Sequence, residues 1–191
     1  DIPSLDKSRR ATFSLEEWRV LTRQMRKWVD EGSRGSTGHI ARDRYVVQQY
    51  VLILANCGAR VGELRSLRWN EIQTTTLENG TKRLVASVKG KTGERQMVFN
   101  EGTDEYVKRL YDMRKKELSG DVPYDGFVVC NRDGSPIGSL KKGFASVLQF
   151  CGLELNSKGE RRTLYSLRHF YATQRLSDEV SPYLLASNMG T

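Results

Sequence analysis

Three short β-prone runs lie between helical patterns near the middle of the chain, and they limit the folds open to it. The runs cover residues 72–77, 83–88 and 95–99. Asn79-Gly80 separates the first two, and Asn-Gly between two such runs is the strongest short-range hairpin signal. A longer, basic turn from Lys89 to Glu94 separates the second run from the third. The pattern therefore predicts a three-stranded antiparallel meander.

Helical patterns occupy most of the remaining sequence. Apolar residues recur on one face between Leu15 and Val29 after a capping-box sequence, and residues 45–55 are apolar almost all round, as in a central helix. Further helices are predicted over residues 60–69, 104–118, 139–150 and 166–176, the last with Ser166 as its cap, and from Ser181-Pro182 onward, with a short extended piece at 127–129. The fold class is therefore predicted to be mainly α with a small three-stranded antiparallel sheet (α+β).

The length of the chain limits the number of domains, and its net charge indicates the kind of partner. The chain has 191 residues, enough for one domain with its own core. Residues 1–12 are polar and charged without periodicity, which predicts the end of a linker before a domain at 13–191. A formal net charge of +8 and an isoelectric point near 9.5 favour a polyanionic partner.

The sequence shows neither a membrane span nor a cofactor motif. No apolar stretch approaches the roughly 20 residues that cross a bilayer, and the first residues lack the pattern of a secretory signal. We therefore expect a soluble protein that contacts DNA or RNA. Cys57, Cys130 and Cys151 have no CxxC spacing, so we expect reduced, buried thiols and no zinc site. The absence of a P-loop and of clustered Asp, Glu and His predicts no metal and no nucleotide cofactor.

Two arginine segments far apart in the sequence are suited to bind one shared anion. Gly58 to Glu63 follows an apolar helix and a glycine break, and Tyr165 to His169 opens another amphipathic run. The tip of the second predicted hairpin adds Lys89 and Lys91. Two guanidinium groups and one ammonium group on one phosphodiester would meet negative charge on several oxygens at once. A structural salt bridge is the alternative role for each arginine.

A basic stretch near the C-terminus is the predicted DNA-facing surface. Between Lys141 and Arg175 there are seven Lys or Arg against two Glu, a local excess of five positive charges. Contacts to backbone phosphates use such residues without tight geometry. The candidates are Lys141, Lys142, Arg161 and Arg162, and a solvated helix face remains the alternative for each of them.

Taken together, these motifs resemble the catalytic domain of tyrosine recombinases, the phage integrase family. They comprise Arg60 in a G-x-R-x-x-E setting, a lysine on a hairpin tip and an x-x-L-R-H segment about a hundred residues later. The resemblance extends from Phe13 to Thr191 and includes the order of helices and sheet. It implies the family's catalytic-domain fold and site-specific DNA recombination or integration, by cleavage and rejoining through a 3′-phosphotyrosine link without metal or nucleotide.

The same resemblance implies partners and a setting. The partner would be double-stranded DNA at attachment sites, and the protein would associate with itself into a dimer or tetramer on that DNA. A protein of this kind would be bacterial or phage-encoded and would act in the cytoplasm at the nucleoid.

Position by position, the resemblance assigns roles around the phosphate. Arg60 and Arg168 match the two arginines that hold the scissile phosphate. Lys91 matches the general acid that protonates the departing 5′ oxygen, and Lys89 is its rival at the same tip. Glu63 is similar to a buried acidic residue that holds an arginine in place, with a simple surface carboxylate as the alternative.

Three positions depart from the family pattern or are ambiguous. Tyr165 stands where the family usually has histidine, and a phenol donates a hydrogen bond well but is a poor base at neutral pH. His169 matches a histidine that supports the fold or the site, and a satisfied core histidine is an equally good interpretation. Thr191 stands where the family has another histidine donor to the phosphate. The nucleophilic tyrosine of the family lies beyond that position, so we expect it past Thr191 and expect residues 1–191 alone to be inactive.

Two other functional classes remain open. A non-catalytic DNA-binding module would keep the basic surface while the site has decayed. A relaxation enzyme of the type IB topoisomerase kind would share the chemistry and remove supercoils without sequence preference. A metal-dependent nuclease is a further alternative, which cleavage in the presence of EDTA would exclude.

Overall fold

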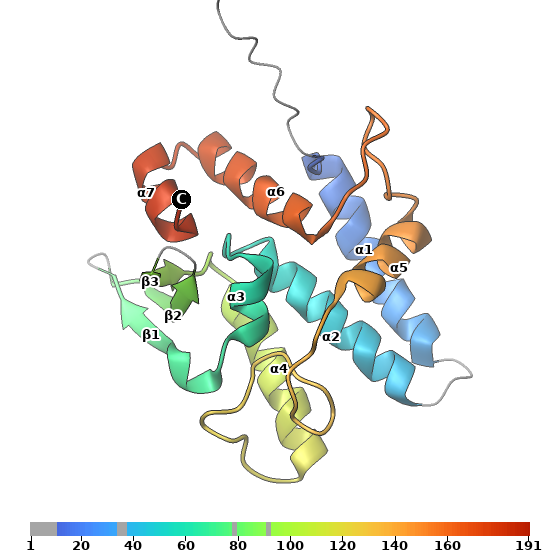
Figure 1. The fold of residues 1–191 in the computed structure, drawn as a ribbon, viewed down its shortest axis with the longest axis vertical. Coiled ribbons are helices and arrows are strands. Elements are labelled where there is room, and N and C mark those ends of the chain that lie inside the picture. The colour runs from blue at the N-terminus through green and yellow to red at the C-terminus, as the bar shows by residue number, and fades with distance from the viewer. Residues whose placement is uncertain (1–10, 34–37, 78–79, 91–92) are drawn as a thin grey trace, which may run out of the picture.

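The computed structural model describes residues 11–33, 38–77, 80–90 and 93–191, and these form a mainly helical domain with one small sheet (Figure 1). The helices are α1 (Leu15–Ser33), α2 (Gly38–Leu54), α3 (Val61–Ser66), α4 (Thr103–Leu118), α5 (Lys141–Cys151), α6 (Leu164–Ser177) and α7 (Pro182–Met189). The strands are β1 (Ile72–Thr76), β2 (Lys82–Gly90) and β3 (Gly93–Val98), and a 3-10 turn, η1 (Trp69–Glu71), precedes the first of them. The predicted fold class is confirmed.

The sheet is the predicted meander. Its strand order is β1-β2-β3 with antiparallel pairing throughout, and Thr74 opposes Leu84 while Ala86 opposes Met97. Ala86 and Met97 are both buried, so one face of the sheet is turned to the core. Gly80 has φ +79° in the first turn, as that turn requires, while Asn79 lies outside the described residues.

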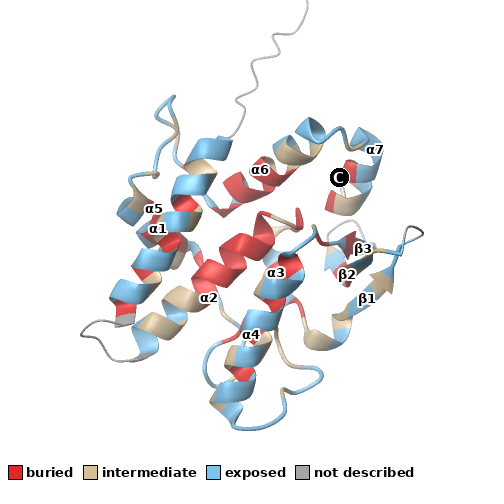
Figure 2. Ribbon diagram, turned by 180° about the vertical axis from the view of Figure 1, so that it is seen from behind, coloured by how far each residue is buried: buried red, intermediate tan, exposed pale blue. Residues whose placement is uncertain are grey.

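Helix α2 is the centre of the core, as its apolar sequence predicts. Figure 2 shows its C-terminal half buried, and Tyr50, Val51, Ile53 and Leu54 have no exposed surface. Helices α1, α4, α5 and α6 all pack against it. A helix that is apolar on every side can be covered only when neighbours surround it, which fixes α2 in the middle of the domain.

Two details differ from the sequence predictions. Helix α6 begins at Leu164 with Thr163 in the capping position, and the Oγ of Ser166 accepts a hydrogen bond from the backbone N–H of Thr163 (3.0 Å). Ser166 is thus the third helical residue and not the cap. Phe127 forms an isolated bridge with Arg68, and residues 128 and 129 form a bend, so the predicted extended piece at 127–129 is limited to one residue. Ala11, the first described residue, is buried.

Helix α7 is joined to the domain mainly through its last turn. Its buried residues Leu185 and Met189 pack with Tyr171 in a small cluster apart from the main core. The Asn188 side chain pairs with β3 as another strand would: its Oδ1 accepts from the N–H of Val98 (2.7 Å), and its Nδ2 donates to the carbonyl of Val98 (3.3 Å). One amide side chain thereby satisfies part of the open edge of the sheet.

The structure also bears on the predictions about cysteines, membrane spans and metal sites. All three cysteines are free thiols, with Cys57 and Cys130 buried and Cys151 half-buried. No helix in the described part of the chain has the length and hydrophobicity to cross a membrane. Within those same ranges, no group of three or more His, Cys, Asp or Glu side chains is arranged to hold a metal ion.

Candidate active site

A left-handed turn after α2 delivers Arg60 to the site. Gly58 has φ +66°, and a Cβ atom there would lie 2.5 Å from two ring carbons of Tyr171, so no side chain fits. Arg60 has extended backbone angles and precedes α3, which begins at Val61. The predicted helix over 60–69 is therefore shorter than expected, and Arg60 projects from its capping position.

Glu63 is the acceptor at the centre of the site. Its side chain is only 4% exposed, and its carboxylate accepts hydrogen bonds from the backbone N–H and the Nη1 of Arg60, both at 2.8 Å. The same carboxylate accepts two further bonds from Nη1 and Nη2 of Arg95, also at 2.8 Å each. One buried carboxylate thus orients two guanidinium groups.

Arg168 approaches the same place from α6. Its side chain is buried and donates to the carbonyl oxygens of Gly58 and Met189, the latter at 2.8 Å. Arg60 donates through Nη2 to the next carbonyl, that of Gly190. Burial, and then the nearby charge of Arg60, lower the pKa of Arg168 below its ordinary value. The structure therefore brings together two arginines that are far apart in the sequence, at the end of α7.

The hairpin of β2 and β3 reaches the arginines through Gly90. A Cβ atom on Gly90 would lie 2.5 Å from Oε1 of Glu63 and 2.7 Å from Nη1 of Arg60, so only glycine allows this approach. Lys91, the next residue in the sequence and the expected general acid, lies outside the described residues. Lys89 is exposed on β2. The described part of the hairpin thus lies directly on the arginine cluster.

Arg95 is the member of the site that sequence reasoning missed. It lies on β3 in the same alternation as Met97 and Phe99, which are both buried. That phase was the available signal, because a charged residue in the inward phase of a strand needs a buried partner of opposite charge. The partner is Glu63, about thirty positions away in sequence.

The pKa of Glu63 gives a prediction on stability. Burial raises this pKa, but the hydrogen bonds from Arg95 and Arg60 outweigh burial and bring it to about 2, against an ordinary 4.5. As pH falls, Glu63 therefore binds a proton in the unfolded chain before it does so in the folded protein. The stabilisation that the ionised Glu63 gives to the folded state is present above about pH 4.5 and is lost as pH falls toward 2. We expect Glu63 to contribute of the order of 3 kcal/mol to this loss.

Urea unfolding between pH 5 and pH 3 measures the first part of this loss, about 2 kcal/mol. The Glu63→Gln variant should show a visibly shallower decline of its free energy of unfolding with falling pH. The same slope in both proteins would contradict the assignment of a depressed pKa to Glu63.

The residues that depart from the family pattern lie next to the cluster. Tyr165 is in the first turn of α6, three residues before Arg168 on the same helix, and is 44% exposed. Thr191 is exposed and follows Gly190, and its N–H donates to the carbonyl of Ala186 (3.1 Å). His169 is half-buried on α6.

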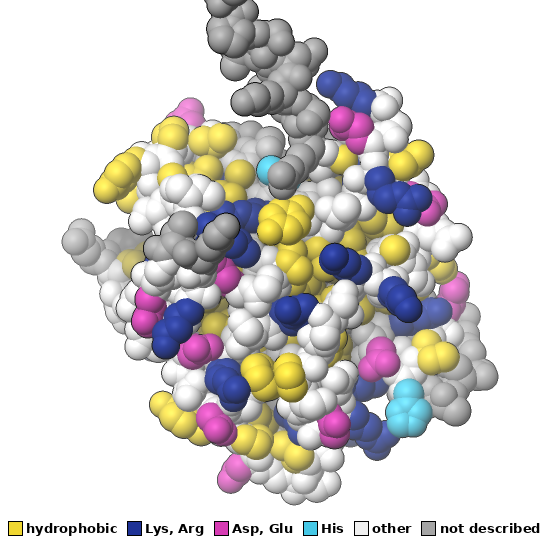
Figure 3. Space-filling model, viewed as in Figure 1, with side chains coloured by type: hydrophobic (Ala, Val, Ile, Leu, Met, Phe, Trp, Pro, Cys, Tyr) yellow, Lys and Arg dark blue, Asp and Glu magenta, His cyan; other side chains and the backbone are white. Residues whose placement is uncertain are grey.

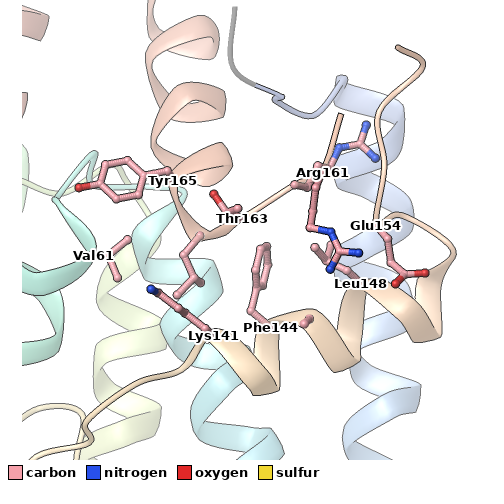
Figure 4. Close-up of a pocket in the computed structure, with 11 residues that line it drawn as sticks. Val61, Lys141, Phe144, Leu148, Glu154, Arg161, Thr163 and Tyr165 are labelled. Atoms are coloured by element: carbon pink, nitrogen blue, oxygen red, sulfur yellow. The ribbon is translucent and has the colours of Figure 1, made fainter. Parts of the chain in front are cut away.

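A pocket of about 280 Å³ opens beside the cluster, between α3, α5 and the start of α6 (Figure 4). Tyr165 and Val61 lie at one end of it, and Arg161 and Glu154 lie at the other. Phe144 forms part of its apolar wall. Val61 follows Arg60 in the sequence and Tyr165 precedes Arg168 by three residues, so both segments that carry the arginines border this pocket.

Three of the four predicted phosphate contacts are exposed. Lys141 and Lys142 form the first turn of α5, and Arg161 lies shortly before α6. On the face of the molecule seen in Figure 3, cationic side chains are spread across the middle, beside a hydrophobic band. These residues are therefore available to a polyanion, as the sequence predicts for a DNA-facing surface.

Arg162 has a structural position instead. Its side chain is 1% exposed, and it donates to the Glu17 carboxylate (2.6 Å) and to the carbonyls of Thr12, Leu153 and Leu155. Its guanidinium carbon also lies 4.8 Å from the ring centre of Phe13. The expectation that Arg162 contacts DNA is corrected, because its donors tie the N-terminal segment to the loop before α6.

Comparisons with known proteins agree with this arrangement. The model of the phage integrase family matches residues 34–190. XerH site-specific recombinase bound to difH substrate has 20% identity and a TM-score of 0.68 over 94% of this chain and 46% of that one. A lambda integrase dimer bound to a COC′ core site has 15% identity and a TM-score of 0.62, over 97% of this chain and 59% of that one.

The lambda integrase catalytic core alone has 14% identity and a TM-score of 0.59, over 95% of this chain and 91% of the other. No curated protein sequence matched the chain. The chain spans about half the length of the XerH structure that it matches. At these identities the structural matches show the fold, and the family model covers most of the sequence. The chain therefore belongs to the phage integrase family and has the fold of its catalytic core.

Proposed function

We propose that this domain performs site-specific recombination of DNA, cutting and rejoining strands through a 3′-phosphotyrosine intermediate. The observation that carries the proposal is the convergence of Arg60 and Arg168 on one place at the end of α7. In this proposal the reaction needs neither a metal nor a nucleotide, because the bond energy of the cleaved strand is kept in the protein link.

The two arginines suit the transition state of such a reaction. Each has donors left over, because Arg60 uses one N–H each of Nη1 and Nη2 within the protein, and Arg168 does the same. The remaining N–H groups are fixed in direction and would meet charge that develops on the non-bridging oxygens without solvent reorganisation. By analogy with oxyanion holes, such a donor is worth about 2.7–4 kcal/mol.

The other site residues take supporting roles in this proposal. Lys91 is the general acid for the departing 5′ oxygen, and Tyr165 and Thr191 donate hydrogen bonds to the phosphate where the family has histidines. His169 supports the start of α6. The nucleophile in this proposal is a tyrosine beyond Thr191.

The partner is proposed to be double-stranded DNA at attachment sites, with Lys89, Lys141, Lys142 and Arg161 on its phosphates. XerH was solved on its difH substrate, and lambda integrase as a dimer on a core site and as a tetramer on a Holliday junction. By analogy we propose a dimer or tetramer on DNA. The protein would be encoded by a bacterium or phage and would work in the cytoplasm at the nucleoid.

The test is covalent capture of nicked DNA. A chain extended past Thr191 to include its tyrosine is mixed with nicked duplexes taken from the ends of the DNA element that encodes it. We expect an adduct resistant to denaturant, formed equally with and without EDTA, and absent when the nucleophilic tyrosine is replaced by phenylalanine. Absence of any adduct would favour a non-catalytic DNA-binding module, and adducts without sequence preference would favour the topoisomerase class.

A further inference from the structure

All three side-chain nitrogens of Arg95 donate hydrogen bonds to acceptors inside the protein. Its Nε donates to the carbonyl of Asn188 (3.0 Å), while Nη1 and Nη2 form a bidentate pair with the Glu63 carboxylate at 2.8 Å each. The side chain is 13% exposed. Each of its three nitrogens therefore has an acceptor inside the protein, in the planar geometry that distinguishes arginine from lysine.

Two glycines, Gly190 and Gly90, lie close against this guanidinium group. A Cβ atom on Gly190 would lie 2.9 Å from the Cζ, Nε and Nη1 of Arg95, and Gly190 has φ +70°. A Cβ atom on Gly90 would lie 3.4 Å from Nη1 of Arg95. The group thus fills the space between the hairpin and the end of α7, which leaves it no room to swing toward solvent.

The contacts of Arg95 join three separate elements. It lies on β3, its carboxylate partner is on α3, and its carbonyl partner is in the last turn of α7. Glu63 in turn holds Nη1 of Arg60 at 2.8 Å. If Arg95 were absent, the buried carboxylate would lose two of its four hydrogen bonds, and its orientation would no longer be fixed on the side opposite Arg60.

We propose that Arg95 is a positioning residue of the recombination site, which acts on the phosphate through Glu63 and Arg60. This rests on the function proposed above, since Arg60 is taken to hold the scissile phosphate. Arg95 also ties β3 to the last turn of α7, which precedes Thr191. The residue therefore orders Arg60 and the end of α7 from a largely buried position.

The first arm of the test needs no DNA cleavage. In the 191-residue chain, the side-chain Nε–Hε resonance of Arg60 is followed by NMR. We expect restricted motion in the wild type, and increased mobility of Arg60 in Arg95→Gln and in Glu63→Gln. Arg83→Gln is the matched control, because Arg83 is on the neighbouring strand and pairs with the exposed Glu101. An unchanged Arg60 signal in Arg95→Gln would overturn the proposal.

The second arm uses the extended chain and measures covalent adduct formation at saturating DNA. Arg95→Gln should slow the step about 100-fold, the size expected for a small misplacement of a catalytic group, while duplex affinity stays within about twofold. Because Arg95 acts through Glu63, the two substitutions should not have additive effects. The double variant Arg95→Gln/Glu63→Gln should form adduct at a rate within about threefold of that of Glu63→Gln alone. Additive losses, or a loss of affinity that accounts for the whole effect, would overturn the proposal.

The NMR arm and the cleavage arm distinguish failure of the proposed function from failure of the positioning role of Arg95. If the wild-type extended chain forms no adduct, the proposed function fails, and the NMR arm still decides whether Arg95 orders Arg60. Thermal unfolding is recorded for each variant. If Arg95→Gln does not fold, Arg95→Lys enters both arms, since an ammonium group keeps the charge but cannot make the bidentate pair or the bond to Asn188.

Discussion

Replacing Arg60 by alanine is expected to slow covalent cleavage of DNA by about 10²–10³-fold, the cost of removing a preorganised donor to a developing oxyanion. The free energy of unfolding should change little, so that loss of folded protein does not account for the loss of activity. Glu63 keeps its bidentate partner Arg95 when Arg60 is removed, so the buried carboxylate remains paired. The measurement is single-turnover adduct formation by the extended chain, with urea unfolding recorded in parallel.

Arg83→Ala is the control for this experiment, because Arg83 lies on β2 and pairs with the exposed carboxylate of Glu101 and not with Glu63. Its cleavage rate should match the wild type. Wild-type rates in Arg60→Ala would remove Arg60 from the site and with it the main support for the proposed chemistry. Arg168 is a poorer choice for an alanine test, because its loss would leave the buried carbonyls of Gly58 and Met189 without donors and would confound activity with folding.

Arg162→Ala is expected to destabilise the domain by about 3 kcal/mol, because it removes a buried cation and leaves its acceptors unpaired. Those acceptors are three backbone carbonyls and the Glu17 carboxylate. Its neighbour Arg161 is exposed, so Arg161→Ala should leave the free energy of unfolding unchanged. Urea unfolding of both variants measures the contrast.

DNA binding should show the reverse contrast between the two positions. Loss of one phosphate contact lowers the slope of log affinity against log salt by about one, and we expect this for Arg161→Ala. Arg162→Ala should keep the wild-type slope under conditions where it is folded. A stable Arg162→Ala protein with a reduced slope would return Arg162 to the DNA-binding surface and contradict its structural role.

The pair at 161 and 162 shows why the sequence alone could not sort its basic residues. Leu155 forms an isolated bridge with Arg161, so the chain is extended there and successive side chains point to opposite sides. One arginine faces solvent, and the next faces the segment around Phe13, more than a hundred residues earlier. Composition counts both as positive charges, and only the tertiary contact between distant segments distinguishes them.

Local signals predicted other parts of the fold well. The uniform apolar character of residues 45–55 and the alternation around Asn79-Gly80 depend only on near neighbours, and α2 and the meander follow them. The convergence of Arg60 and Arg168 was predicted from two arginine segments suited to bind one shared anion, and the family resemblance then assigned both to the scissile phosphate. Arg95 was missed because its partner Glu63 lies on α3, and only the tertiary fold brings that helix close to Arg95 on β3.

The attachment of α7 has a consequence for dynamics. This helix has few apolar contacts of its own, and its last three carbonyls, at residues 188, 189 and 190, accept bonds from Arg95, Arg168 and Arg60. A segment held in this way opens at a smaller free energy than the main core, so its backbone amides should exchange with solvent ahead of those in α2. When α7 opens, three arginines lose a carbonyl acceptor at the same time. The electrostatic repulsion among their guanidinium groups is then less compensated, which raises the free energy of the open state and favours closure of the helix.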